Sequence, residues 1–164
     1  MNRSVSTFLV LCLAVGGPTG CATVPTDPGL RVTDPGLRVV VTPAQAEMWA
    51  SEREIPPGLN GPYWVLPDSL VRRVDRALLR RLPSVSTPRP DGLRAIDGYG
   101  IQYLGFTRDG QRLVYANGFC DWQELPDPTQ QWLVVFDGGG CFFGATYDPV
   151  EGRLLRFHSN TKAD

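Results

Sequence analysis

The sequence has little of several residue types, and each shortage excludes a class of protein. It contains one histidine, His158, so a zinc site built from several histidines is excluded. Its 16 basic residues are balanced by 17 acidic ones, so the basic excess typical of a nucleic-acid-binding domain is missing, and we expect no nucleic-acid partner. It also lacks an apolar run of the roughly 20 residues that a membrane-spanning helix needs.

Glycine and proline, by contrast, are abundant, with 18 and 15 residues in a chain of 164. Such a composition disfavours a compact helical bundle and favours a β-containing fold with many turns. The length suits one domain together with targeting and tethering segments.

The N-terminus has the pattern of an export signal. Arg3 is followed by a short apolar run at residues 8–15 and then by small residues and a turn. Residues 19–22 read Thr-Gly-Cys-Ala and resemble the lipobox of bacterial lipoproteins, in which the chain is cut before a cysteine that then carries lipid.

This resemblance implies a signal peptide at residues 1–20, lipid on Cys21 and attachment to a bacterial membrane. Ala22 is not the aspartate that resembles an inner-membrane retention signal, so the outer membrane is the expected location. Pro18 stands where the motif usually has an aliphatic residue. An ordinary signal peptide, cut near Ala22 to leave a soluble secreted protein, therefore stays an alternative.

Residues 21–62 are predicted to form a flexible tether with a possible short helix. Residues 26–32 and 33–39 are identical copies of Thr-Asp-Pro-Gly-Leu-Arg-Val, which are too few for a solenoid and are rich in turn residues. Thr42 and Gln45 then form a capping-box pattern that predicts a helix over residues 43–54. Met48 and Trp49 are its candidate docking residues, although the sequence leaves open whether the helix docks.

A second helix is predicted from Asp68 or Ser69, either of which can cap it, to about Leu82. Apolar residues recur at three- and four-residue steps, which predicts one buried face. They are Leu70, Val71, Val74, Ala77, Leu78 and Leu82. Arg72, Arg73, Arg76 and Arg80 fall on the other side; such a face can contact anionic headgroups or an acidic partner, or can simply be solvated.

Five β-rich runs follow, at residues 99–107, 112–119, 131–136, 141–147 and 153–157. Arg108-Asp109-Gly110 predicts a hairpin between the first two. The run 131–136 is apolar throughout, which predicts a central strand buried on both faces.

The predicted domain, residues 63–160, is therefore α+β: one amphipathic helix on a five-stranded antiparallel sheet, followed by a tail at 161–164. This element order resembles cystatin-like folds. Residues 99–106, 132–143 and 147–149 also resemble a pattern among uncharacterised bacterial exported proteins, a resemblance that implies no activity.

Cys120 and Cys141 are the two cysteines expected in the mature domain. Because an exported protein meets an oxidising compartment, we predict that they form a disulfide. A thiol nucleophile at Cys141, assisted by His158 and Asp137, is the alternative and requires the bridge to be reduced.

Two further groups are candidate binding residues, and neither predicts a cofactor or a bound metal. Gly138, Gly139 and Gly140 either form an anion-binding nest or simply a tight turn between strands. Phe142, Phe143 and Tyr147 form an apolar patch for a protein partner if alternate members face outward. Asp121, Glu124 and Asp127 match no calcium-binding spacing.

The sequence thus favours a lipid-anchored envelope protein whose domain is a non-enzymatic binding or structural module. A protease-inhibitor-like module, acting through residues 121–130 or the glycine turn, is the first alternative. An enzyme using Cys141 or an acidic site is the second.

We predict that Cys21 carries acyl chains in protein taken from the bacterial envelope. Mass spectrometry of that protein should find a chain beginning at Cys21 and heavier than the bare polypeptide by its acyl groups. Cys21→Ser should abolish the added mass, because serine offers no thiol for the lipid. Envelope-bound protein with an unmodified Cys21 would contradict the lipobox interpretation.

Overall fold

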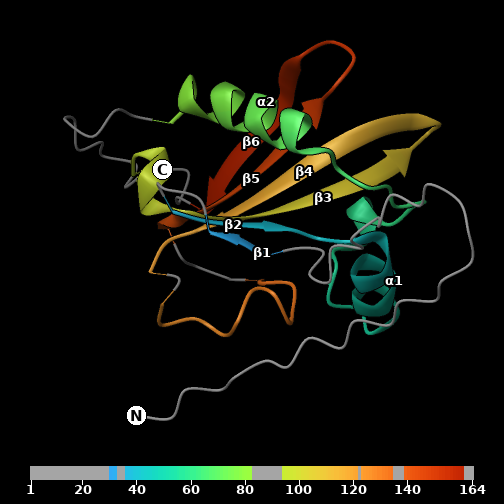
Figure 1. Cartoon of the computed structure of the whole chain (residues 1–164), viewed down its shortest axis with the longest axis horizontal. Coiled ribbons are helices and arrows are strands. Elements are labelled where there is room, and N and C mark those ends of the chain that lie inside the picture. The colour runs from blue at the N-terminus through green and yellow to red at the C-terminus, as the bar shows by residue number, and fades with distance from the viewer. Residues whose placement is uncertain (1–29, 33–35, 83–93, 122, 135–138, 161–164) are drawn as a thin grey trace, which may run out of the picture.

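The computed structural model describes residues 30–32, 36–82, 94–121, 123–134 and 139–160. They form one six-stranded sheet with two α-helices, so the α+β class predicted from the sequence is confirmed (Figure 1). The expected signal segment, Cys21 and the tail 161–164 lie outside the described residues. No helix within the described ranges is long and apolar enough to cross a bilayer.

The sheet is mixed, which corrects the prediction of five antiparallel strands. In spatial order its strands are β1 (Leu30–Val32), β2 (Leu37–Val40), β3 (Gly100–Arg108), β4 (Gln111–Phe119), β5 (Gly139–Asp148) and β6 (Arg153–Asn160). Every neighbouring pair is antiparallel except β2 and β3, which run parallel. A long connection containing both helices separates these two strands in the chain, and parallel pairing requires such a crossover.

The hairpin between β3 and β4 forms as predicted. Asp109 and Gly110 both have positive φ, 53° and 76°, as a type I′ turn requires. The alternation of β3 gives it two apolar faces: Ile101 and Tyr103 pack with the second helix, whereas Leu104 and Phe106 pack in a cluster on the opposite side. Strand β3 is consequently buried on both faces.

Helix α2 (Asp68–Leu79) covers one face of the sheet and buries Leu70, Val74, Ala77 and Leu78, in agreement with the predicted stripe (Figure 1). Its N-cap is Pro67, which has no side-chain acceptor, so the predicted capping by Asp68 or Ser69 is wrong. Asp68 instead occupies the first turn, where a carboxylate interacts favourably with the helix dipole.

Helix α1 (Pro43–Ser51) begins with the predicted capping box between Thr42 and Gln45. It docks through Trp49, which is 1% exposed, whereas Met48 is 48% exposed and was wrongly predicted to dock. Trp49 packs in the cluster with Leu104 and Phe106.

Residues 37–59 therefore belong to the folded unit, which shortens the flexible tether predicted to reach residue 62. The physical reason is burial: β2 adds a strand to the sheet, and Ile55 and Leu59 join the same apolar cluster as Trp49. The sequence of this region is too rich in proline to show an apolar period.

The segment 131–134 is not a strand, which corrects the predicted central strand at 131–136; residues 135 and 136 lie outside the described part of the chain. Trp132 and Leu133 are buried as an apolar run suggests, but Val134 is 46% exposed. Side chains rather than a neighbouring strand satisfy the backbone here, as described below.

We predict that Trp49→Ala destabilises the fold by about 3–5 kcal/mol, because it leaves a large cavity in a packed cluster. Met48→Ala, one position earlier on the same helix, should cost less than about 0.5 kcal/mol, because Met48 is half exposed. Urea unfolding followed by circular dichroism measures both. Equal, small costs would show that α1 does not contribute to the core.

Candidate functional site

A cavity of about 130 Å³ lies on the sheet face opposite α2, between β4, β5, β6 and the segment 131–134. Its lining combines aromatic, aliphatic and uncharged polar groups. The lining residues are Pro56, Tyr115, Asn117, Trp132, Leu133, Val134, Phe142, Phe143, Gly144 and His158.

Gly144 lies among the three polar side chains of the cavity, Tyr115, Asn117 and His158. It pairs with Asn117 of β4 on one side and with His158 of β6 on the other. A Cβ at Gly144 would lie 2.0 Å from the Tyr115 hydroxyl and 2.3 Å from Cε1 of His158. The side chains of Tyr115 and His158 therefore lie over the backbone of Gly144, and any residue larger than glycine would displace them from the cavity.

The wall formed by residues 131–134 is held by Gln102, whose side chain is fully buried in β3. Its Nε2 donates to the carbonyls of Pro128 and Gln131, at 2.8 and 2.7 Å, and its Oε1 accepts from the Leu133 N–H at 3.1 Å. These side-chain hydrogen bonds replace the backbone bonds that a neighbouring strand would make, which explains why the apolar residues 132–134 do not form a strand.

Asn117 completes this wall from β4. Its Nδ2 donates both to Gln102 Oε1, at 3.1 Å, and to the carbonyl of Leu133, at 2.7 Å. The position of Trp132 and Leu133 beside the cavity thus depends on two side-chain amides rather than on backbone pairing.

The Tyr115 hydroxyl and the His158 ring nitrogens have no hydrogen-bond partner among the described residues, so they are the polar groups that a ligand would meet. Burial, followed by the nearby Arg156, lowers the pKa of His158. Burial raises the pKa of Tyr115. Both groups are therefore uncharged at neutral pH, and the cavity suits an uncharged ligand group.

The predicted aromatic patch is only partly formed. Phe142 is half-buried and lines the cavity, as does Phe143, although Phe143 and Tyr147, each 2% exposed, belong to the core under α2. The alternation of β5 separates them, because Phe143, Ala145 and Tyr147 share the face toward α2. Of these three aromatic residues, Phe142 alone therefore faces away from α2, and its contact with a partner stays a prediction.

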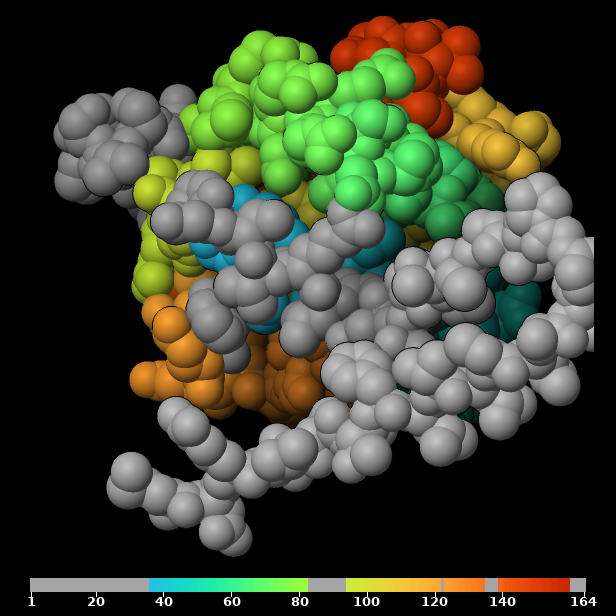
Figure 2. Space-filling model, in the orientation of Figure 1, coloured from blue at the N-terminus to red at the C-terminus, as the bar shows by residue number. Residues whose placement is uncertain are grey.

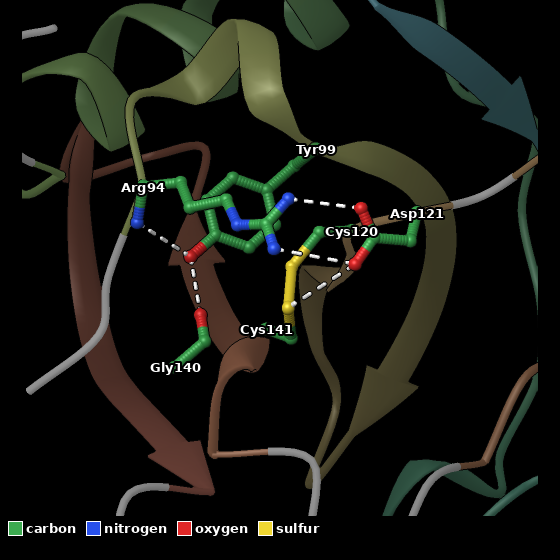
Figure 3. A network of polar contacts seen from close by, with 6 residues as sticks. All are labelled: Arg94, Tyr99, Cys120, Asp121, Gly140 and Cys141. Atoms are coloured by element: carbon green, nitrogen blue, oxygen red, sulfur yellow. Dashed lines mark hydrogen bonds and ion pairs between the residues drawn. A yellow bond between two sulfur atoms is a disulfide. The ribbon is translucent and has the colours of Figure 1, made fainter.

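In the described part of the glycine run, Gly139 has a positive φ of 57°, as a turn requires, and the choice between a turn and an anion-binding nest stays a prediction. Gly139 and Gly140 are the first residues of β5, and Gly138 lies outside the described residues, as does Asp137. Gly140 is buried and its carbonyl accepts a hydrogen bond from the Tyr99 hydroxyl (Figure 3).

The predicted disulfide is confirmed: Cys120 and Cys141 are bonded, with Cα atoms 5.1 Å apart. Beside it, Arg94 forms two hydrogen bonds with the Asp121 carboxylate, at 3.0 and 3.2 Å (Figure 3). An Asp121 oxygen also lies 3.8 Å from Cys141 Sγ, a contact rather than a hydrogen bond because a disulfide sulfur carries no hydrogen.

This arrangement leaves little for the other predicted chemistry. Cys141 offers no thiol while the bridge exists, and its sulfur cannot serve as a metal-binding thiolate with Cys120 and Asp121, which lie close to it. Asp127 accepts hydrogen bonds from the backbone and hydroxyl of Thr129, and Asp121 is paired with Arg94. Two of the three acidic groups considered for calcium thus have partners within the protein.

Comparison with models of protein families, with curated proteins and with solved structures found no match. Of the residues that line the cavity, the sequence singled out Phe142 and Phe143 as binding residues and His158 as a catalytic assistant. Tyr115, Asn117 and Gly144 were missed, because only the register of β4, β5 and β6 brings them together.

We predict that His158 titrates below its usual value of about 6.5. As pH falls through 6.5 the unfolded chain binds the proton first, so this histidine lowers folding stability between that pH and its folded pKa. Arg156→Gln should raise the midpoint part of the way, because burial remains.

Nuclear magnetic resonance of the chain without a histidine tag measures this midpoint directly, since the sequence has one histidine. Arg153→Gln is the matched control on the same strand, because Arg153 pairs with Glu151 at 2.6 Å. His158 is exposed by surface area but partly desolvated where it lines the cavity, and a midpoint at or above 6.5 in the unmodified chain would contradict that desolvation.

Proposed function

We propose that the domain is a non-enzymatic binding module, held at a bacterial membrane by lipid on Cys21, and that its cavity receives one uncharged side chain of a protein partner. The lipobox-like segment supports the anchor. The observation that carries the binding role is the cavity beside Gly144, with two uncharged polar groups and an aromatic wall.

The size of the cavity favours a single side chain over a cofactor or metabolite. Small-molecule sites usually enclose roughly 300–1,000 Å³. A volume of about 130 Å³ is closer to engineered cavities of about 150 Å³ that bind benzene. A phenyl or branched aliphatic group fits this space, and the Tyr115 hydroxyl or the neutral His158 ring can hydrogen-bond to the backbone beside it.

Strand β6 offers a way for such a partner to bind. It is the last strand in the order of the sheet, and His158 projects from it to the cavity. An extended partner segment can add to an open sheet edge through its backbone while one side chain enters an adjacent pocket. A second pocket of about 590 Å³ shares residues 132–134 with the cavity, is lined also by Arg53 and Leu125, and enlarges the contact surface.

A protease-inhibitor-like role is the alternative, and it rests on the loop 121–130. Gln45 Nε2 donates to the carbonyl of Thr129 at 3.1 Å, and Gln102 holds Pro128, so the loop is anchored at one end while several of its side chains are exposed. A preorganised exposed loop is what a protease inhibitor presents. Slowing of a protease by micromolar domain would favour this role over the cavity.

Blocked heptapeptides of sequence Thr-Val-Thr-X-Thr-Val-Thr, with X as Phe, Leu, Ala or Asp, test the cavity. With protein purified from the envelope in nonionic detergent, we expect the Phe and Leu peptides to bind roughly ten- to a hundredfold more tightly than Ala, and Asp to bind least. Resonance shifts should concentrate at Tyr115, Trp132 and His158.

Two variants test whether the cavity itself is responsible. Gly144→Ala places a Cβ against Tyr115 and should abolish the preference for Phe, whereas Gly58→Ala, with no atom within 4 Å of the added carbon, should leave it unchanged. Val134→Asp introduces a charge at an exposed lining residue without disturbing the core and should also weaken binding. The proposal is overturned if all four peptides bind equally or if neither cavity variant changes their affinities.

A further inference from the structure

The outward side of α2 carries a group of exposed arginines. Arg72, Arg76 and Arg80 succeed one another at four-residue steps and are exposed, while the opposite stripe of the helix is buried in the core. Arg73 and Arg81 are also exposed and extend the basic region toward β6. All five are arginines in a chain whose basic residues include a single lysine, Lys162.

These arginines have no acidic partner among the described residues. The ion pairs that the structure shows there are Arg38–Asp75, Arg94–Asp121 and Arg153–Glu151. Asp75 lies on α2 itself but turns toward β2 and β3, where it contacts Arg38 and the Tyr103 hydroxyl. Because the formal net charge of the chain is −1, this positive region is a local concentration of charge and not a general property of the protein.

An exposed apolar tip lies next to the arginines. Arg73 donates a hydrogen bond of 2.8 Å to the carbonyl of Pro149, in the turn between β5 and β6, and so connects α2 to that turn. The next residue, Val150, is 87% exposed, and Leu79 on α2 is 55% exposed. Figure 1 places α2 and the β5–β6 turn at the same side of the molecule, and Figure 2 shows them adjoining on its surface.

We infer that this region docks on the headgroups of an anionic phospholipid bilayer. We call it the arginine surface and define it as Arg72, Arg73, Arg76, Arg80, Arg81, Leu79 and Val150. Guanidinium groups bind phosphate through two parallel hydrogen bonds, and exposed aliphatic side chains beside them can enter the interface between headgroups and acyl chains. An acidic protein partner would account for the arginines but not for the exposed Val150, whereas a bilayer accounts for both.

The inference uses residues outside the cavity and does not depend on what binds there. It concerns how the domain lies against a membrane. Two of the arginines are already positioned. Arg73 is hydrogen-bonded to the carbonyl of Pro149, and the Arg81 guanidinium carbon lies 4.7 Å from the centre of the Phe157 ring. These two side chains therefore lose less conformational freedom on docking.

Co-sedimentation of the full chain carrying Cys21→Ser with lipid vesicles tests the docking surface without the lipid anchor. Vesicles of phosphatidylcholine alone are compared with vesicles that contain about one third phosphatidylglycerol. We expect binding to the anionic vesicles that weakens as salt is raised. Replacing Arg72, Arg76 and Arg80 with Gln should reduce the partition coefficient by roughly a hundredfold, since each arginine near an anionic surface contributes several-fold.

The matched control replaces Arg53, Arg112 and Arg156 with Gln, which removes the same charge from exposed arginines elsewhere and should change binding far less. Val150→Ser should reduce binding several-fold without altering its dependence on salt. Circular dichroism verifies that each variant is folded. The inference is overturned if the two triple variants bind equally, if phosphatidylcholine vesicles bind as well as anionic ones, or if the folded chain binds neither.

Discussion

The side-chain amide of Gln102 is the interaction on which the arrangement around the cavity depends. A buried amide must find partners for its donors and acceptor, because leaving them unpaired away from water is costly. Gln102 meets this requirement by bonding to Pro128, Gln131, Leu133 and Asn117. The need to satisfy one polar group inside β3 thus determines where Pro128, Gln131 and Leu133 lie, and with them the position of the aromatic wall.

A second buried polar group plays a corresponding part on the α2 side of the sheet. Arg38 of β2 is 4% exposed; its guanidinium group contacts Asp75 of α2 at 3.3 Å and donates to the Tyr99 carbonyl at 2.9 Å. Asp75 also accepts from the Tyr103 hydroxyl, and burial together with this carboxylate raises the pKa of Tyr103 well above its usual range. One connected network of charged and polar side chains therefore joins β2, β3 and α2. Strand β2 is in this way integrated with the rest of the fold.

The features that could be predicted from the sequence are those set by neighbouring residues. Asp109-Gly110 specifies its turn through local backbone preference, and Thr42 with Gln45 specifies a helix start through bonds three residues apart. The apolar period of α2 likewise lies within one element. The disulfide was predictable because the domain has two cysteines and an expected export would favour their oxidation.

The features that could not be predicted depend on contacts between distant parts of the chain. An apolar run such as 131–134 looks like a central strand until Gln102 and Asn117 are known to bind its backbone. The cavity needs the register that places Gly144 between Asn117 and His158, and no spacing in the sequence reports a register. The outward face of α2 was visible as a row of arginines, but its proximity to Val150 follows only from the packing of α2 against the β5–β6 turn.

The bond between Cys120 and Cys141 has one more consequence if a protease reaches the chain between them. The described residues 121 and 123–134 of this loop run outside the sheet, and the disulfide links the two ends of the loop covalently. A peptide bond hydrolysed within that loop would therefore release no fragment, since the C-terminal hairpin would stay attached through sulfur and through its pairing with β4. Cleaved molecules would therefore stay in one piece. Their two polypeptide fragments would separate only after the disulfide had been reduced and the domain had unfolded.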